Sequence, residues 1–587
     1  MNIDKHPLLS LALVFLLPPT SMAAAPAAAF GAMTPAAIKA APAALPPLME
    51  AMTTEMNRAL AALQKSAQEN QPAPYFLSYL AHDVQRLEIV AEHGAILRSN
   101  PGRWRNADIV IRVGDAKVDN THGNHRSSAL HTIDLPLADD RAALARSLWR
   151  GTNTGYSNAL QSLLKVKSEL AVHAKEEDSS ADFSAQPPVS DVAAPLPAPV
   201  LDKTAWEGRM RSLSALFRSH PQVSSDSVSL SVSTEYDTFV SSEGSRLAYP
   251  KQNFRIVVLA STRAEDGMDL RLVRTFEGRS EQDLPPQAEL EKQVGELATQ
   301  LDALRAAPPA EPFDGPVLLA GRASAVFFHE VLGHRLEGQR QRGTQEGETF
   351  TKDVGKPILP AFLSVADDPT LESAAGVHLN GFYRFDDEGQ PAQRVELVDK
   401  GVLQQFLMSR MPIAHFDSSN GHGRAQAGRM PIGRQGNLIV TAAATKPEKK
   451  LREMLIEEIK KQKKPYGLYF ADIASGYTLT QRILPQAFQV IPQLVYRVYG
   501  DGRLDELVRG VNIVGTPQAS LLKIVAAGDR PQVFNGECGA ESGSVPVAAV
   551  APALLFSEME TQKAAQGNAR PPLLPAPLAE ATAKEDK

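Results

Sequence analysis

The sequence predicts an α+β fold in several domains, with helices and strands mixed in the N-terminal half and a β-rich C-terminal half. Three observations predict it. The chain has 587 residues, 43% of them hydrophobic, which is enough for more than one core. Apolar residues recur at helical spacing in separate segments, most clearly in 48–68, 284–306 and 446–464. Between these segments lie short runs that alternate as strands do.

The first 23 residues are expected to be a secretory signal peptide. A basic start precedes an apolar stretch from Leu8 to Leu17, and Ser21-Met22-Ala23 offers a small-x-small cleavage site. The stretch is too short for an ordinary membrane span, although an uncleaved anchor remains the alternative. Residues 24–47, rich in Ala and Pro, are expected to form a disordered leader. The mature protein is therefore expected to be exported, periplasmic or secreted, without a stable membrane span.

The helical and strand-like segments after residue 47 divide the rest of the chain into five expected regions. An amphipathic helix over 48–68 precedes alternating strands, and a second helix is expected from Arg141 to His173 with an interruption around Gly151 to Gly155. The next segment is acidic and then rich in Pro, Ala and Ser, as linkers are. We expect an N-terminal α/β domain at 48–174, a linker at 175–200, a β-rich middle region at 201–310 that ends in a helix, a C-terminal domain at 311–562 and a disordered tail at 563–587.

The charge argues against a nucleic-acid-binding protein, and the cysteine content excludes an internal disulfide. The net charge of −6 is small for this length, and no basic face of the kind that binds nucleic acid is evident. The chain has one cysteine, Cys538, so it cannot form an internal disulfide. In an exported protein a free thiol is a liability unless it is buried and inert or bound to a metal.

The motif that most clearly suggests a catalytic or metal-binding site is His329-Glu330-Val331-Leu332-Gly333-His334. Two imidazoles and a thiolate are ligands that Zn²⁺ favours, and a catalytic zinc site keeps a fourth position open for water. We expect His329, His334 and Cys538 to bind the metal. Glu330 is the expected general base, because a carboxylate beside the metal can take a proton from zinc-bound water.

The spacing of the histidines restricts the local structure. They stand at i and i+5, which places them roughly 140° apart around a regular helix. Both can reach one metal only if the helix expected over residues 322–340 ends or distorts between them, and Gly333 is the residue best able to allow this. Glu337, three residues after His334, is a rival third ligand or a supporting residue. Cys538 is expected in a loop, because Gly536, Gly539 and Gly543 surround it.

These residues resemble the metal motif of the TldD/PmbA family of zinc metallopeptidases, whose signature is HExxxH with a distant cysteine. The resemblance implies an α/β N-terminal region followed by a β-rich C-terminal metal-binding domain. It also implies the catalytic TldD branch rather than the TldE/PmbA branch, which lacks the motif. Export departs from the familiar cytoplasmic members. The likeness is carried by Phe328 to Gly338, Asp386-Asp387-Glu388-Gly389, Leu407-Met408-Ser409-Arg410, Gly421-His422-Gly423-Arg424 and Cys538-Gly539.

Two smaller groups have competing interpretations. His422 and Arg424 lie in a Gly-rich segment and could orient a substrate carbonyl or carboxylate, although loop packing is the simpler interpretation. Asp386, Asp387 and Glu388 are expected to form a solvated turn within a hairpin over residues 382–398, rather than a second cation site.

Two functions follow as hypotheses. The first is a zinc metallopeptidase, for which the resemblance implies unfolded or small peptide substrates and pairing as a homodimer or with a TldE/PmbA-like subunit. The second is a non-hydrolytic peptide-binding or assembly protein, in which zinc is structural and a fourth ligand closes the site. An intact glutamate beside the first histidine favours the first.

Overall fold

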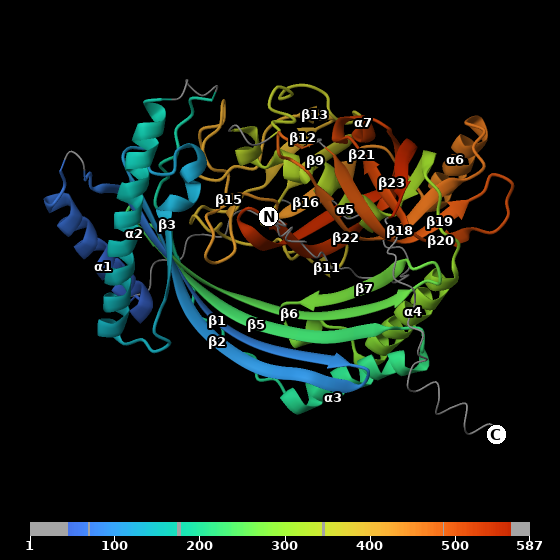
Figure 1. The fold of residues 1–587 in the computed structure, drawn as a ribbon, viewed down its shortest axis with the longest axis horizontal. Helices are drawn as coiled ribbons and strands as arrows, with labels where there is room; N and C mark the ends of the chain where they lie inside the picture. The colour runs from blue at the N-terminus through green and yellow to red at the C-terminus, as the bar shows by residue number, and fades with distance from the viewer. Residues whose placement is uncertain (1–44, 69–70, 173–177, 343–346, 485–486, 565–587) are drawn as a thin grey trace, which may run out of the picture.

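A computed structural model describes residues 45–68, 71–172, 178–342, 347–484 and 487–564. A curved seven-stranded sheet lies below a second body built around a twelve-stranded sheet (Figure 1). The expected signal peptide, most of the expected leader and all but the first two residues of the expected tail lie outside the described residues. Among the described residues, no helix has the length and apolar character needed to cross a membrane.

The seven-stranded sheet joins segments far apart in the sequence. Its strand order is β3-β2-β1-β5-β6-β4, with β7 paired to β6, and all pairs are antiparallel except β4 with β6. The expected N-terminal and middle regions therefore share one sheet through the pairing of β1 with β5. The strands are β1 Pro74–Glu92, β2 Ala95–Val113, β3 Leu130–Asp134, β4 Ser190–Val192, β5 Ser225–Ser241, β6 Arg246–Arg263 and β7 Asp269–Gly278.

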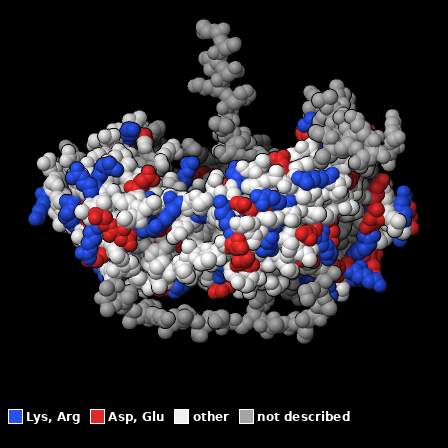
Figure 2. Space-filling model, turned by 90° about the horizontal axis from the view of Figure 1, so that it is seen from below, with Lys and Arg blue, Asp and Glu red and all other residues white. Residues whose placement is uncertain are grey.

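Four helices cover this sheet. α3 and α4 bury their apolar faces against β1, β5, β6 and β7, whereas α1 and α2 pack at the end formed by β1, β2 and β3 (Figure 1). On the face seen in Figure 2, acidic and basic side chains are interspersed. The helices are α1 Pro47–Lys65, α2 Arg141–Leu170, α3 Lys203–Ala215 and α4 Gln287–Ala306, with 3₁₀ turns at Gly123–Ala129, Leu216–Ser219 and Glu281–Asp283.

The interruption expected in α2 is wrong, because this helix runs without a break for 30 residues. Its two internal glycines face the sheet. A Cβ at Gly151 would lie 2.6 Å from Ile109 Cδ1, and one at Gly155 would lie 3.1 Å from Ile111 Cδ1. Glycine here allows close packing of helix on sheet rather than a break.

The described part of the expected linker, from residue 178 onward, contacts both bodies. β4 adds to the edge of β6. Phe183 is buried, and its ring lies 4.1 Å from the Arg112 guanidinium and 4.0 Å from that of Arg410. Arg410 follows the metal motif in sequence, so this segment connects the two bodies. The domain boundaries themselves stay predictions.

The twelve-stranded sheet encloses α5, Gly321–Val331, of which every residue is buried. The last strand, β23, pairs with β8, β16, β21 and β22 and so crosses the centre of this body. The strands are β8 Phe313–Leu319, β9 Leu363–Asp367, β12 Val395–Asp399, β13 Val402–Leu403, β16 Asn437–Ala442, β17 Thr445–Lys446, β18 Gly467–Thr478, β19 Phe488–Val498, β20 Glu506–Val508, β21 Val511–Gly515, β22 Ile524–Ala540 and β23 Gly543–Lys563.

Smaller elements complete this body. The expected hairpin over residues 382–398 is confirmed only next to its turn, where Phe385 and Pro391 form an antiparallel bridge. Its expected second strand, Val395–Asp399, pairs with β9 and β13 instead. The expected solvated turn is wrong, since Asp386 is buried and accepts hydrogen bonds from the backbone N–H groups of Gln390 and Gly423. The remaining elements are α6 Glu448–Lys461, α7 Pro517–Leu521 and the two-residue strands β10 Ser373–Ala374, β11 Val377–His378, β14 Gly423–Arg424 and β15 Ile432–Gly433.

Candidate metal centre

The two histidines are placed by a helix that stops between them. α5 carries His329 and ends at Val331, and a 3₁₀ turn over Gly333–Leu336 carries His334. The predicted break is confirmed, although the helix is shorter than the expected 322–340. A second 3₁₀ turn, Gly338–Gln341, replaces the rest.

Gly333 is required at the break for space. Its φ is not positive, so backbone freedom is not the reason. A Cβ at Gly333 would lie 1.9 Å from Oε1 of the buried Gln435. The Nε2 of Gln435 donates to the backbone oxygen of His329 at 3.3 Å. Gln435 therefore joins the end of α5 to the segment that precedes β16.

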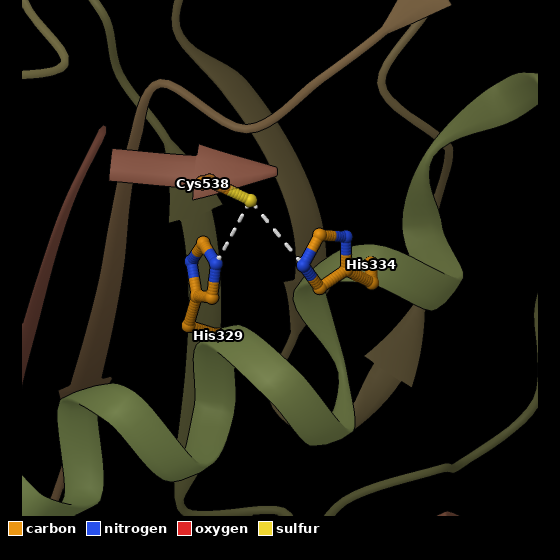
Figure 3. Close-up of side chains that lie close together, drawn as sticks. All are labelled: His329, His334 and Cys538. Atoms are coloured by element: carbon orange, nitrogen blue, oxygen red, sulfur yellow. Dashed lines mark hydrogen bonds between the residues drawn. The ribbon is translucent and has the colours of Figure 1, made fainter. Parts of the chain in front are cut away.

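His329, His334 and Cys538 converge on one point (Figure 3). Cys538 Sγ lies 3.2 Å from His329 Nε2 and 3.3 Å from His334 Nε2. All three side chains are buried, with exposed fractions of 1%, 6% and 2% for His329, His334 and Cys538. Two imidazole nitrogens and one thiolate are a donor set that fits zinc.

Cys538 lies in a strand, so the expected loop is wrong. It belongs to β22, opposite Val545 of β23, close to the tight turn between these strands. The buried guanidinium of Arg434 holds this hairpin: it donates to the backbone oxygens of Cys538 at 2.5 Å and Gly543 at 3.0 Å. The thiol is thus aimed at the histidines by a rigid sheet.

The surroundings favour the thiolate of Cys538. Burial by itself would raise the pKa of this thiol, but the imidazoles of His334 and His329 and the Arg434 guanidinium lower it well below its ordinary value. The thiolate is the form that binds a metal. This environment fits a metal ligand, and the ligand role of Cys538 stays a prediction.

Glu330 lies beside this group. Its Oε2 is 3.9 Å from His334 Nε2, and the carboxylate is buried. Burial raises the pKa of Glu330, and Cys538 and Glu337 add to the rise against the opposing effect of the two histidines. A raised pKa brings a carboxylate closer to the range in which it can accept and return a proton.

Glu337 binds the back of His334 instead of joining the three donors. Its Oε1 lies 3.2 Å from His334 Nδ1, and its Oε2 accepts a hydrogen bond from Arg340 Nε at 2.7 Å. Burial alone would raise the pKa of Glu337, but His334 and Arg340 lower it to about 2. A carboxylate on the second ring nitrogen orients a metal-binding histidine, so this geometry makes Glu337 a positioning residue.

His422 and Arg424 lie outside the three-residue group. His422 is fully buried, with Nδ1 2.9 Å from the backbone oxygen of Asn420 and Nε2 3.3 Å from Asp367 Oδ1. Arg424 donates to the backbone oxygen of Gln435 at 2.7 Å, and Gln435 in turn contacts the end of α5. Their contact with a substrate stays a prediction.

Three residues of the site had no signal in the sequence. Arg434 and Gln435 stand in a glycine-rich segment without a recognisable motif. Gly476, in β18, is a third: a Cβ there would lie 2.5 Å from Glu330 Cγ. Such neighbours become visible only when distant strands are brought together.

Known proteins resemble the part of the chain that carries this site. Residues 313–563 match the model described as the PmbA/TldA metallopeptidase C-terminal domain. A metalloprotease of Methanocaldococcus jannaschii is 28% identical over 232 residues, which are 39% of this chain and 47% of the relative. A metalloprotease TldD homolog of Haemophilus influenzae is 27% identical over 248 residues, 42% of this chain and 47% of that protein.

Residues 313–563 therefore resemble the C-terminal domain of the TldD/PmbA family. A zinc metalloprotease TldD homolog of Saccharolobus solfataricus is 26% identical over 234 residues, 40% of this chain and 48% of that relative. The chain spans about half the length of the curated relatives it matches.

Solved structures extend the TldD/PmbA likeness over most of the fold. TldE from Thermococcus kodakarensis has a TM-score of 0.55 at 12% identity and covers 86% of this chain and 100% of its own. A protein of Thermotoga maritima titled a putative modulator of a DNA gyrase has a TM-score of 0.54 at 14% identity and covers 87% of this chain and 99% of its own. The predicted α+β multidomain class with a β-rich C-terminal region is confirmed.

Proposed function

We propose that this chain is a zinc metallopeptidase of TldD type that hydrolyses peptide bonds in unfolded or small peptide substrates. The observation that carries the proposal is the buried Glu330 carboxylate beside three converging donors, 3.9 Å from His334 Nε2. The curated relatives, which are named metalloproteases, support the class of reaction.

The residues divide the work between binding and proton transfer. His329, His334 and Cys538 would hold the metal. Zn²⁺, when bound, supplies a Lewis acid that polarises a carbonyl and makes water more acidic. Glu330 would take a proton from the attacking water and return it to the leaving amine. Because Gly476 has no side chain, the Glu330 carboxylate can lie between β18 and the histidines.

A structural zinc site in a peptide-binding or assembly protein is the second candidate. Such a site would be closed by a fourth protein ligand. Within the described part of the chain, the group of candidate ligands at this point consists of three residues, and Glu337 faces the opposite side of the His334 ring. Three converging donors with a carboxylate beside them support hydrolysis.

The proposal also includes the export of the protein and its association with a second subunit. We infer that the mature protein acts in the periplasm or outside the cell, from the signal-like segment at its N-terminus. Its subunit partner would be a second copy or a TldE/PmbA-like chain, a proposal supported by the shared fold with TldE of Thermococcus kodakarensis.

The test measures metal content and cleavage of an unstructured peptide library for the purified protein. We expect one zinc in this centre of the wild type, loss of that zinc in Cys538→Ser, and retained zinc without cleavage in Glu330→Gln. Glu558→Gln is the matched control, because Glu558 is half exposed and pairs with Lys523. If zinc is present but the wild type stays inactive even with a TldE-like subunit, the binding-protein function replaces the peptidase.

A further inference from the structure

A second histidine lies among acidic residues in the seven-stranded sheet, apart from the Cys538 centre. His82 in β1 pairs with Asp237 in β5. Its Nδ1 lies 2.7 Å from Asp237 Oδ1 and 2.9 Å from Glu235 Oε1. Lys251 Nζ contacts the other oxygen of Asp237 at 2.5 Å.

The short distances on the Nδ1 side are those of hydrogen bonds. Donor atoms that share one metal ion at bond lengths of about 2.1 Å lie about 3 Å or more apart. Nδ1 therefore carries a proton that it donates to Asp237 and Glu235. Burial by itself would lower the pKa of His82, but Asp237 and Glu235 raise it well above its ordinary value. A metal ion at Nε2 would therefore displace a proton and take the lone pair of that atom.

The other ring nitrogen of His82, Nε2, has no hydrogen-bond partner among the described residues. His82 is only 5% exposed, and its Nε2 makes no hydrogen bond. It borders a cavity of about 20 Å³ that Asp108 and Asp387 also line. Such a volume holds one water molecule or one ion.

The distance across the cavity fits a bridging ion. Asp108 Oδ2 lies 3.9 Å from His82 Nε2, which is too long for a direct hydrogen bond. Two metal–ligand bonds of about 2.1 Å reach across at most about 4.2 Å, so one ion can bind both atoms. The hydrogen bond from Nδ1 to Asp237 then has the arrangement in which a carboxylate orients a metal-binding histidine.

The charge around the cavity also favours a cation. Four carboxylates surround the imidazole, against two side chains with permanent positive charge, and a metal ion at Nε2 would replace the imidazole proton. A divalent ion would balance the difference. The carboxylates are Asp108, Glu235, Asp237 and Asp387, and the cations are Lys251 and the exposed Arg429.

We propose that this cavity is a second divalent-cation site, with His82 Nε2 and the Asp108 carboxylate as ligands and Asp387 at its edge. Mixed imidazole and carboxylate ligands suit Zn²⁺, Mn²⁺ or Co²⁺. The ion would join β1 and β2 to the segment 425–431, whose Gly428 N–H already donates to Asp108 at 2.8 Å. This site does not depend on the proposed peptidase activity.

Cobalt titration of the metal-free full chain separates the two sites. Co²⁺ at Cys538 produces a thiolate charge-transfer band, whereas Co²⁺ at His82 cannot. We expect two equivalents to bind, of which only one adds to this band. His82→Gln and Asp108→Asn should each bind one equivalent fewer, while the intensity of the thiolate band stays the same.

The retained thiolate band shows that each variant is folded at the Cys538 centre. Asp134→Asn is the matched control, because Asp134 is an exposed carboxylate on the neighbouring strand β3, and it should bind two equivalents. If Asp108→Asn loses the band as well, Asp387→Asn serves as the second variant. Binding of a single equivalent by the wild type, or a second equivalent that survives in both His82→Gln and Asp387→Asn, would show that the cavity holds only water.

Discussion

Gly476 and Glu330 are in direct contact, although they lie 146 positions apart in the sequence numbering. A Cβ at Gly476 would lie 2.5 Å from Glu330 Cγ and 3.0 Å from Glu330 Cδ. The φ of Gly476 is not positive, so alanine fits the backbone and only the glutamate has to move. The strand β18 thereby sets the position of the proposed base.

Gly476→Ala should lower peptide cleavage and leave zinc bound. Displacing a reacting group by about 1 Å costs on the order of 10²-fold in rate. The three atoms nearest to the added Cβ all belong to Glu330, so the metal ligands should keep their places. The prediction is checked by measuring the cleavage rate and the zinc content of the same preparation. Gly295→Ala is the control, because a Cβ at Gly295 meets nothing within 4 Å. Unchanged cleavage in Gly476→Ala would remove Glu330 from the mechanism.

Glu337→Gln should weaken zinc binding without abolishing it. The carboxylate holds His334 through Nδ1, and loss of such a partner typically costs about 10- to 100-fold in metal affinity. Competition with a chelator measures the change. Glu541→Gln, which alters a different partner of Arg340, should bind zinc normally. Complete loss of zinc in Glu337→Gln together with normal binding in Cys538→Ser would make Glu337 the third ligand.

Gly151→Ala should destabilise the protein even though alanine favours helices. The added Cβ would lie 2.6 Å from Ile109 Cδ1 and 2.9 Å from Ile133 Cγ2. Overpacking costs about 1–3 kcal/mol, against a helix gain of about 0.5–1 kcal/mol. Thermal unfolding should show a lower midpoint. Gly295→Ala, in α4 with open space around it, should be neutral or stabilising, and a rise in both variants would contradict the close packing of α2.

Asp119→Asn should lower the stability of the protein at neutral pH, and this loss of stability should be smaller in acid. Burial alone would raise the pKa of Asp119, but Arg112 and the hydroxyls of Thr121 and Tyr75 lower it. A lowered folded-state pKa adds stability that is fully present above the unfolded value of about 4 and is lost as the pH falls through the folded value.

The effect at pH 7 should be about 3–5 kcal/mol, because Asp119 is fully buried and its removal leaves Arg112 without its ion-pair partner. Unfolding midpoints measured between pH 7 and pH 3 should converge for wild type and variant. Asp134→Asn, an exposed change of the same kind, should shift neither midpoint. Midpoints that stay equally far apart down to pH 3 would exclude the ion pair as the cause.

The metal centre was largely predictable because its chemistry depends on rare residue types. His329 and His334 flank a break that their spacing requires, and Cys538 is the only thiol in the chain. The location of Cys538 was not predictable. Its glycine-rich surroundings suggested a loop, whereas they form one arm of an antiparallel hairpin held by Arg434.

The wrong expectations share one cause. Gly151 and Gly155 suggested a break in the helix, and Asp386 suggested a solvent-exposed turn, because glycine often interrupts helices and aspartate is common in exposed turns. In the fold, a sheet lies against the glycines, and backbone N–H groups surround the carboxylate. Local sequence cannot report such neighbours, which come from other parts of the chain.

The sequence by itself determined the helices and many of the strands, the break at Gly333 and the identity of the three donors, because periodicity and residue chemistry are local properties. Only the tertiary structure decided which atoms meet. The pairing of β1 with β5 places His82 among carboxylates, and β22 and β18 bring Cys538 and Gly476 to the end of α5. The physical reason is that long-range strand pairing and side-chain packing depend on shape and burial across the whole molecule.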